Sequence, residues 1–318
     1  MSNDSDAGTG EYITQLMRKV LENPSDYPIS GRGDDDDTWL LAEIEAGRQQ
    51  QIAEYLEFAV SLVEEAGVLA LHYFNSPRNA LGIRVKAEDD TLVTQADTEI
   101  EAAITTRIRQ RFPTHSVEGE EFPPFVSAYS SSNPKWVIDP IDGTYAFVHG
   151  MPTYGIMVAF MQDDDVWLSA VHFPSLKKTV YSSKGHGSFC NGERLAVSNT
   201  TTLDQALLLT SNIPSPSPSQ KDADAEFWTL YRLAKETRSW GDCYGHYLVA
   251  AGFADVLIDL YMGLTDNAPL MLIISEAGGT YTNYAGDSDP YATKVIITNG
   301  HLFNEVLATI KSSNVIGV

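Results

Sequence analysis

The feature that most constrains this chain is the segment WVIDPIDGT at residues 136–144. Its first three residues are bulky and apolar, which predicts a short buried strand. That strand would deliver Asp139 and Asp142 to the turn that follows it. Hard divalent cations such as Mg²⁺ bind oxygen ligands, and the carbonyl of Ile141 lies between the two carboxylates in sequence. The segment therefore predicts a cation site at the end of a strand.

The same segment closes with Gly143 and Thr144, which suit an anion. Glycine lets the backbone approach closely, and two consecutive N–H groups can face a phosphate oxygen. The Thr144 hydroxyl can orient a water molecule. The alternative is a plain turn, because Asp, Pro and Gly are each favoured in turns for local reasons. On this segment alone the two interpretations rank equally.

Further carboxylates follow elsewhere in the chain. Residues 118–121 contribute three glutamates after a strand-like pair, although Glu120 and Glu121 taken separately would be surface residues. Asp266 precedes an apolar helical stretch at residues 268–277, where it could be only an N-cap or the neighbour of one. Each feature alone favours a structural role, and only their combination favours a site.

Composition argues against several classes of protein. The 318 residues include 43 Asp+Glu and 21 Lys+Arg, and the resulting net charge of −22 argues against a nucleic-acid partner. Two cysteines, Cys190 and Cys243, are too few for a disulfide-stapled scaffold. No uninterrupted apolar run of about 18 residues and no secretory signal is recognisable, so we expect no membrane partner and a cytoplasmic location.

The first 51 residues read as an N-terminal extension, because they lack sustained apolar periodicity. Residues 12–21 would form a short docking helix or remain a solvated tail. The acidic tract Asp34–Asp37 reads as a solvated segment without a catalytic role. From Ile52 onward, apolar residues recur on one face of a helix that should end near residues 75–77.

The rest of the chain alternates between strands and helices. The patterns predict helices at 96–111, 224–235, 247–252, 267–277 and 302–310, and strands at 136–139, 156–160, 166–170, 179–181, 207–210, 256–259 and 295–298. Residues 163–165 mark a hairpin tip, and Gly278-Gly279 would cap a helix. These elements predict an α+β fold in which helices cover sheets.

Several of these segments together resemble the inositol monophosphatase family, whose members are Mg²⁺-dependent, lithium-sensitive phosphatases. The matching segments occur in the family's order and extend over about residues 52–311: KAEDDTLVTQAD at 86–97, GEEF at 119–122, DPIDGT at 139–144 with FVHG at 147–150, and EAGG at 276–279. The resemblance implies an αβαβα sandwich. Its N-terminal half would span residues 52–197 with the metal motifs, and its C-terminal half residues 198–318 with the specificity residues.

The resemblance also implies a role for individual residues. Two or three Mg²⁺ ions, with Mn²⁺ as a substitute, would be held by Glu120, Asp139, the Ile141 carbonyl, Asp142 and Asp266. The catalytic residues would be Glu120 and Thr144, which position the attacking water, and Asp97, which supports the water and the metals. The metals would lower the pKa of the water and neutralise the phosphoryl oxygens, without a covalent phosphoenzyme. Family members are commonly dimers, so we expect a homodimer.

The substrate is expected to be a small phosphate ester. The segment SWGDCYG at residues 239–245 is similar to the histidinol-phosphate phosphatase branch, and an acidic Asp242 suits a cationic leaving group. Asp259 matches a family carboxylate that contacts the substrate. The implied substrate-binding residues are Asp142, Gly143, Thr144, Asp242 and Asp259. The alternative for Asp242 and Asp259 is a helix cap or a strand end.

Two other functions remain open at this point. Hydrolysis of inositol monophosphates is the nearest alternative reaction. A phosphate- or metal-binding protein without turnover is an alternative of a different class, because Thr265 stands before Asp266 where the family usually has tryptophan.

Overall fold

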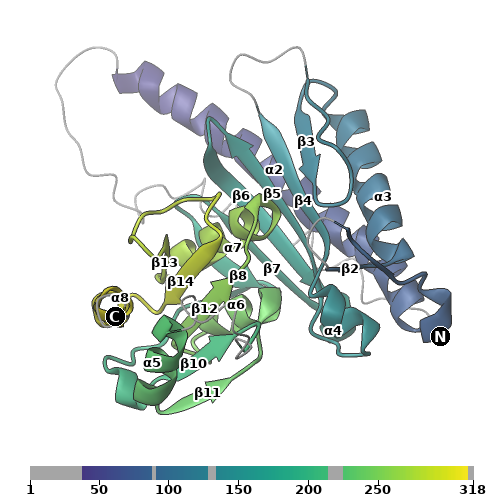
Figure 1. Cartoon of the computed structure of the whole chain (residues 1–318). Coiled ribbons are helices and arrows are strands. Elements are labelled where there is room, and N and C mark those ends of the chain that lie inside the picture. Colours follow the sequence, from purple (N-terminus) through teal and green to yellow (C-terminus); the bar gives the residue numbers. More distant parts are fainter. Residues whose placement is uncertain (1–37, 88–90, 128–133, 214–224, 314–318) are drawn as a thin grey trace, which may run out of the picture.

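The computed structural model describes residues 38–87, 91–127, 134–213 and 225–313, with side chains from residue 47 onward (Figure 1). Its helices are α2 (Thr38–Phe74), α3 (Gln95–Arg111), α4 (Thr144–Val148), α5 (Ala225–Leu233), α6 (Asp242–Ala250), α7 (Leu264–Glu276) and α8 (Phe303–Ser313). Its strands are β1 (Arg84–Val85), β2 (Leu92–Val93), β3 (Ser116–Gly119), β4 (Lys135–Asp142), β5 (Gly155–Gln162), β6 (Asp165–Phe173), β7 (Lys178–Ser183), β8 (Gly187–Cys190), β9 (Glu193–Arg194), β10 (Leu207–Thr210), β11 (Glu236–Arg238), β12 (Val256–Leu260), β13 (Thr280–Asn283) and β14 (Lys294–Thr298).

A seven-stranded sheet in the order β3-β4-β5-β6-β7-β8-β9 forms the N-terminal half. Only β3 and β4 pair in parallel, and the other neighbours are antiparallel. Side chains alternate between the faces of β5. Ile156 and Val158 pack with α2 and α3, whereas Met157 packs with α6 and α7. Both faces of the sheet are therefore covered by helices.

A five-stranded sheet in the order β11-β10-β12-β14-β13 forms the C-terminal half. Here β10 pairs in parallel with both β11 and β12. Leu257 and Ile297 face α6 and α7, while Val256 and Ile296 face the side of α5 and α8. The layers are α2/α3, sheet, α6/α7, sheet and α5/α8, which confirms the αβαβα sandwich (Figure 1).

The element boundaries differ from the sequence predictions in three helices. Helix α2 begins at Thr38, ahead of the predicted Ile52, because helix-forming residues without a clear apolar stripe continue it toward the N-terminus. Helix α6 begins at Asp242 rather than Tyr247, and helix α7 at Leu264 rather than Asn267. In the last two cases glycine is the N-cap, a weak signal beside Ser, Thr, Asn or Asp. Residues 12–21 and the tract Asp34–Asp37 lie outside the described residues.

Other predicted features are confirmed. Asp163 and Asp164 both have positive φ at the hairpin tip between β5 and β6, as in a type I′ turn. Gly278 has φ +92°, and the N–H groups of Gly278 and Gly279 donate to Ser275 and Ile274, which closes α7 with a Schellman motif. Among the described residues, no helix is long and apolar enough to cross a membrane.

Candidate active site

A β-bulge in β4 places two aspartates on the same side of the sheet. Asp139 pairs with Met157 and Asp142 pairs with Gly155, so β4 has two residues between these pairs and β5 has one. In a regular strand, residues three apart point to opposite faces, and the extra residue reverses the alternation. Pro140 lies inside this bulge, where its missing N–H breaks no ladder hydrogen bond.

Asp266 reaches the same place from helix α7. The sequence put it ahead of the helix, but the structure places it in the first turn, with Gly263 as the N-cap. The N–H of Gly263 donates to Asp266 Oδ2 at 2.7 Å, so the carboxylate fixes the entry of the chain into the helix. This contact fixes the orientation of the side chain.

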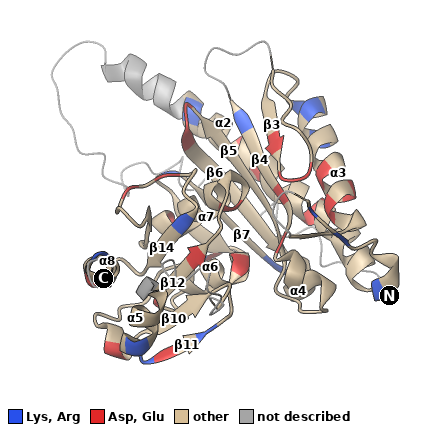
Figure 2. Cartoon of the chain, in the orientation of Figure 1, with Lys and Arg blue, Asp and Glu red and all other residues tan. Residues whose placement is uncertain are grey.

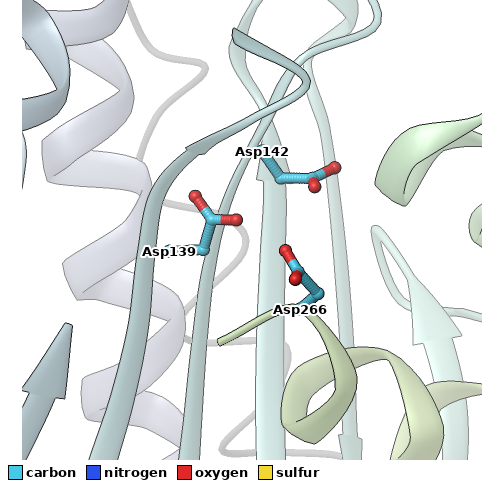
Figure 3. A group of neighbouring side chains, drawn as sticks. All are labelled: Asp139, Asp142 and Asp266. Carbon is cyan, nitrogen blue, oxygen red and sulfur yellow. The ribbon is translucent and has the colours of Figure 1, made fainter. Parts of the chain in front are cut away.

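The three carboxylates converge although they come from two separate elements (Figure 3). One ligand oxygen from each of Asp139, Asp142 and Asp266 lies within 4.8 Å of the others. Among the described residues, no Lys, Arg or His forms an ion pair with any of the three. Burial, followed by the charge of Glu120, raises the pKa of Asp266 to about 6 and that of Asp139 well above its ordinary value.

This group fits a hard divalent cation. Each aspartate uses one oxygen to accept a backbone N–H: Ile141 to Asp139 at 3.0 Å, Cys243 to Asp142 at 2.5 Å and Gly263 to Asp266 at 2.7 Å. The remaining oxygens are hard ligands, and no Lys, Arg or His in the described part of the chain pairs with them. Because packed carboxylates repel one another, a cation between them would remove both the repulsion and the raised pKa values.

Thr144 and Asp97 are hydrogen-bonded to each other beside this group. The Thr144 hydroxyl lies 3.0 Å from the Ile141 carbonyl and 3.2 Å from Asp97 Oδ1. A hydroxyl has a single proton, so it donates to only one of these acceptors at a time. Asp97 Oδ2 accepts from the N–H and the hydroxyl of Thr94, which locks Asp97 into the first turn of α3. The Thr144 hydroxyl therefore has two alternative hydrogen-bond acceptors.

Glu120 lies outside the group of three and is held by a lysine. Lys86 Nζ is 2.7 Å from Glu120 Oε1 and 2.8 Å from Glu121 Oε1. Burial lowers the pKa of Lys86, but the two carboxylates outweigh it and raise the pKa above its ordinary value. The charge of Glu120 still reaches Asp139 and Asp266, where it raises the pKa values after the effect of burial.

Glu101 was missed in the sequence, although it shapes the Glu120 loop. Its carboxylate accepts the backbone N–H of Glu121 at 2.7 Å and of Phe122 at 3.1 Å. A Cβ on Gly119 would lie 2.1 Å from Glu101 Oε1, so only glycine leaves room for this contact. The available signal was an acidic residue within the buried apolar stripe of α3. Acidic residues occur along α3 and in β3 (Figure 2).

Gly143 and Asp242 meet across the two halves of the chain. Gly143 has φ +79°, a left-handed conformation that favours glycine, and it caps the short helix α4. A Cβ on Gly143 would lie 3.1 Å from Asp242 Oδ2. Burial raises the pKa of Asp242 to about 6. The Asp242 carboxylate therefore lies against Gly143 in the DPIDGT turn.

Asp259 is placed differently from Asp242. Its side chain is buried, and Oδ1 accepts the N–H of Ser211 at 2.8 Å. Oδ2 lies 3.9 Å from Nδ1 of His246, which is too long for a hydrogen bond. Burial raises the pKa of Asp259 to about 7 and lowers that of His246 to about 4. Asp259 is thus enclosed by Ser211 and a neutral histidine.

The cysteine beside Asp242 has no nucleophilic character. Cys243 is fully buried, and burial followed by the charge of Asp142 raises the pKa of its thiol well above the ordinary value. Its sulfur would lie 2.6 Å from a Cβ on Gly155, so the thiol fills the space that this glycine leaves open. This environment indicates a packing role for Cys243.

Comparison with known proteins adds an independent line of evidence. The model of the inositol monophosphatase family matches residues 51–314. Histidinol-phosphatase of Chlorobaculum parvum is 37% identical over 233 residues, which cover 73% of this chain and 86% of that protein. Inositol monophosphatase 1 of Bos taurus is 31% identical over 269 residues, which cover 80% of this chain and 93% of that protein.

A solved structure supports the same relationship. The IMPase of Thermotoga maritima superposes with a TM-score of 0.71 at 27% identity, covering 82% of this chain and 98% of that one. The family match at residues 51–314 contains all three residues of the acidic group, Asp139, Asp142 and Asp266.

Proposed function

Since the chain belongs to the inositol monophosphatase family and is a phosphoric monoester hydrolase, we propose that it is Mg²⁺-dependent and acts on L-histidinol phosphate. The observation that carries the metal dependence is the convergence of Asp139, Asp142 and Asp266 within 4.8 Å, with no Lys, Arg or His of the described residues paired to them. The observation that carries the substrate is the Asp242 carboxylate over Gly143.

Five oxygen donors are proposed to hold the metal: the carboxylates of Glu120, Asp139, Asp142 and Asp266, and the carbonyl of Ile141. Bound Mg²⁺, with two or three ions in the complete site and Mn²⁺ as a substitute, would acidify water and neutralise phosphoryl oxygens. When Ile141 donates its carbonyl oxygen to a cation, the Thr144 hydroxyl keeps Asp97 as its acceptor. The Thr144 hydroxyl oxygen then orients the attacking water by accepting a hydrogen bond from it. Glu120 positions the same water.

The proposal of a cationic substrate rests on the charge of Asp242. Asp242 is part-buried, and no Lys or Arg among the described residues pairs with it. A leaving group with an ammonium or an imidazolium would supply the missing positive charge and restore the ordinary pKa of Asp242. The relationship to a histidinol-phosphatase at 37% identity supports the same substrate.

The decisive experiment compares phosphate release from histidinol phosphate and from inositol-1-phosphate with Mg²⁺, with EDTA and with added Li⁺. We expect Mg²⁺-dependent, lithium-sensitive release with a preference for histidinol phosphate, which would place the enzyme in histidine biosynthesis. Asp139→Asn is the matched control, and its retention of wild-type turnover would refute the metal mechanism.

Inositol monophosphate hydrolysis is the second candidate, favoured by the 31% identity to an inositol monophosphatase. A preference for inositol-1-phosphate would establish it and remove the specificity role from Asp242. Mg²⁺ binding without release from either ester would favour a phosphate- or metal-binding protein instead. Thr265, which replaces the expected tryptophan before Asp266, motivates that third outcome.

We further propose a cytoplasmic homodimer divided into an N-terminal half at residues 52–197 and a C-terminal half at residues 198–318. The seven-stranded sheet ends at Arg194 and the five-stranded sheet begins at Leu207, so this boundary falls between the sheets. Light scattering on the full chain and on residues 52–318 tests the dimer. A monomer in both samples would contradict it.

A further inference from the structure

Ser211 is hydrogen-bonded to both Asp242 and Asp259, the two aspartates with the same implied role. Its N–H donates to Asp259 Oδ1 at 2.8 Å, and its Oγ accepts the N–H of Asp242 at 2.7 Å. Strand β10 ends at Thr210 and runs parallel to β12, so Ser211 and Asp259 lie at the same carboxyl edge of the sheet. In open α/β sheets this edge is where ligands bind.

The conformation of Asp242 requires support from outside its own helix. Its φ of +51° is left-handed, which costs energy for any residue that has a Cβ. The hydrogen bond to Ser211 Oγ is the contact that fixes its N–H there. Packing is equally close, since a Cβ on Gly241 would lie 2.0 Å from Ser211 Cα. The place of the Asp242 carboxylate over Gly143 therefore depends on Ser211.

Asp259 has no comparable access to a substrate. It is 1% exposed, and Ser211 occupies Oδ1 while His246 lies beside Oδ2. His246 is fully buried, and its Nδ1 is 3.0 Å from the Asp242 carbonyl. The buried face of this network is thus formed by Asp259 and His246, and only Asp242 extends to the DPIDGT turn.

We propose that Ser211 is the positioning residue that sets discrimination between cationic and neutral phosphate esters, and that Asp259 acts on the substrate only through Ser211. The substrate class rests on the function proposed above, whereas the arrangement of Ser211, Asp242 and Asp259 does not. Ser211 does not touch the substrate. It holds the charged group that does.

A matched control exists at the other end of the same two strands. Ser198 Oγ donates to Asp255 Oδ1 at 2.5 Å, and Asp255 Oδ2 accepts the N–H of Leu207 at 2.7 Å. Ser211→Ala removes the acceptor of the Asp242 N–H. Ser198→Ala likewise removes a serine–aspartate hydrogen bond beside β10 and β12, but at the end of these strands that lies away from the DPIDGT turn. A merely structural effect of losing a serine would occur in both variants.

The assay is the ratio of kcat/KM for 2-aminoethyl phosphate to that for propyl phosphate, which are similar in size and differ in charge. Ser211→Ala should lower this ratio about fivefold, the effect of one lost hydrogen bond, chiefly through KM for the cationic ester. Asp242→Asn should lower it at least as much. Asp259→Asn should keep it within about twofold, because the amide oxygen still accepts the Ser211 N–H.

Two results would overturn the proposal: an unchanged ratio in Ser211→Ala, or a collapse in Asp259→Asn equal to that in Asp242→Asn, which would put Asp259 in contact with the substrate. A wild-type enzyme that does not distinguish the two esters refutes the cationic substrate instead. Hydrogen exchange at the Asp242 amide then decides the positioning role by itself. It should accelerate about fivefold in Ser211→Ala and remain unchanged in Ser198→Ala, and equal exchange in both would refute the role.

Discussion

Replacing Asp139 with asparagine should stabilise the metal-free protein and abolish its stabilisation by Mg²⁺. The amide oxygen keeps the hydrogen bond from the Ile141 N–H, while one charge leaves the group of three carboxylates. Two ionised groups 4.8 Å apart repel by about 3.5 kcal/mol at an effective dielectric constant of 20. Each carboxylate takes part in two of the three pairs, so removing the charge of Asp139 leaves a single repelling pair, Asp142 and Asp266.

Protonation limits how much of this repulsion is felt. The pKa of Asp266 rises from 3.8 to about 6. At about 1.4 kcal/mol per pKa unit, ionised Asp266 therefore destabilises the fold by no more than about 3 kcal/mol. A carboxyl with a raised pKa destabilises the fold as the pH rises from its unfolded value through its folded value. The cost is therefore complete at pH 8, about half as large at pH 5, and lost only below about pH 4. Asp139→Asn should gain about 1–3 kcal/mol at pH 8 and less at pH 5.

Thermal unfolding followed by circular dichroism measures this effect. In EDTA at pH 8 the variant should melt about 2–6 °C above the wild type, at about 2 °C per kcal/mol for a chain of this size. Mg²⁺ at about 100 times its Kd should stabilise the wild type by about 2.7 kcal/mol and the variant by much less. A variant that melts lower in EDTA, or that keeps the full Mg²⁺ shift, would refute the reasoning.

Three further predictions follow from single contacts. Thr144→Val should lower kcat about a hundredfold with little change in melting temperature, whereas Thr144→Ser should retain most activity, and equal losses in steady-state kinetics would contradict the hydroxyl's role. Glu101→Gln should raise the Mg²⁺ concentration needed for half-maximal activity and cost about 1–3 kcal/mol in urea unfolding, because a charged acceptor of the Glu121 and Phe122 N–H groups is lost; an unchanged Mg²⁺ requirement would separate Glu101 from the site. Gly119→Ala, which would push a methyl against Glu101, should show the same Mg²⁺ defect, and Gly185→Ala, in an open loop at φ +83°, is a control that should cost stability without it.

Much of the fold was predictable because local patterns report local structure. Alternation in β5, the stop signals of α3 and the glycines after α7 predicted these elements, since side-chain periodicity and turn chemistry act over a few residues. The predicted starts of α6 and α7, at residues 247 and 267, were wrong because a glycine N-cap carries little signal. The helices begin at Asp242 and Leu264. Strands β11 and β13, at residues 236–238 and 280–283, had no distinct pattern of their own and are defined by their sheet neighbours.

The sequence by itself identified the candidate residues of the site. The order of Asp97, Glu120, Asp139, Asp142 and Thr144 along the chain, and their resemblance to one family, required no coordinates. What the sequence determined was therefore the set of donor groups and the turn that presents two of them, because both depend on neighbours within a few positions.

Only the tertiary structure decided how those groups are used. The bulge in β4 turned Asp139 and Asp142 to one side, and the docking of α7 brought Asp266 to within 4.8 Å of them. Asp242 and Asp259 are the same residue type with the same implied role, yet one lies over Gly143 and the other is buried behind Ser211. Burial and long-range contact set the charge, pKa and access of each carboxylate, and these depend on residues distant in sequence.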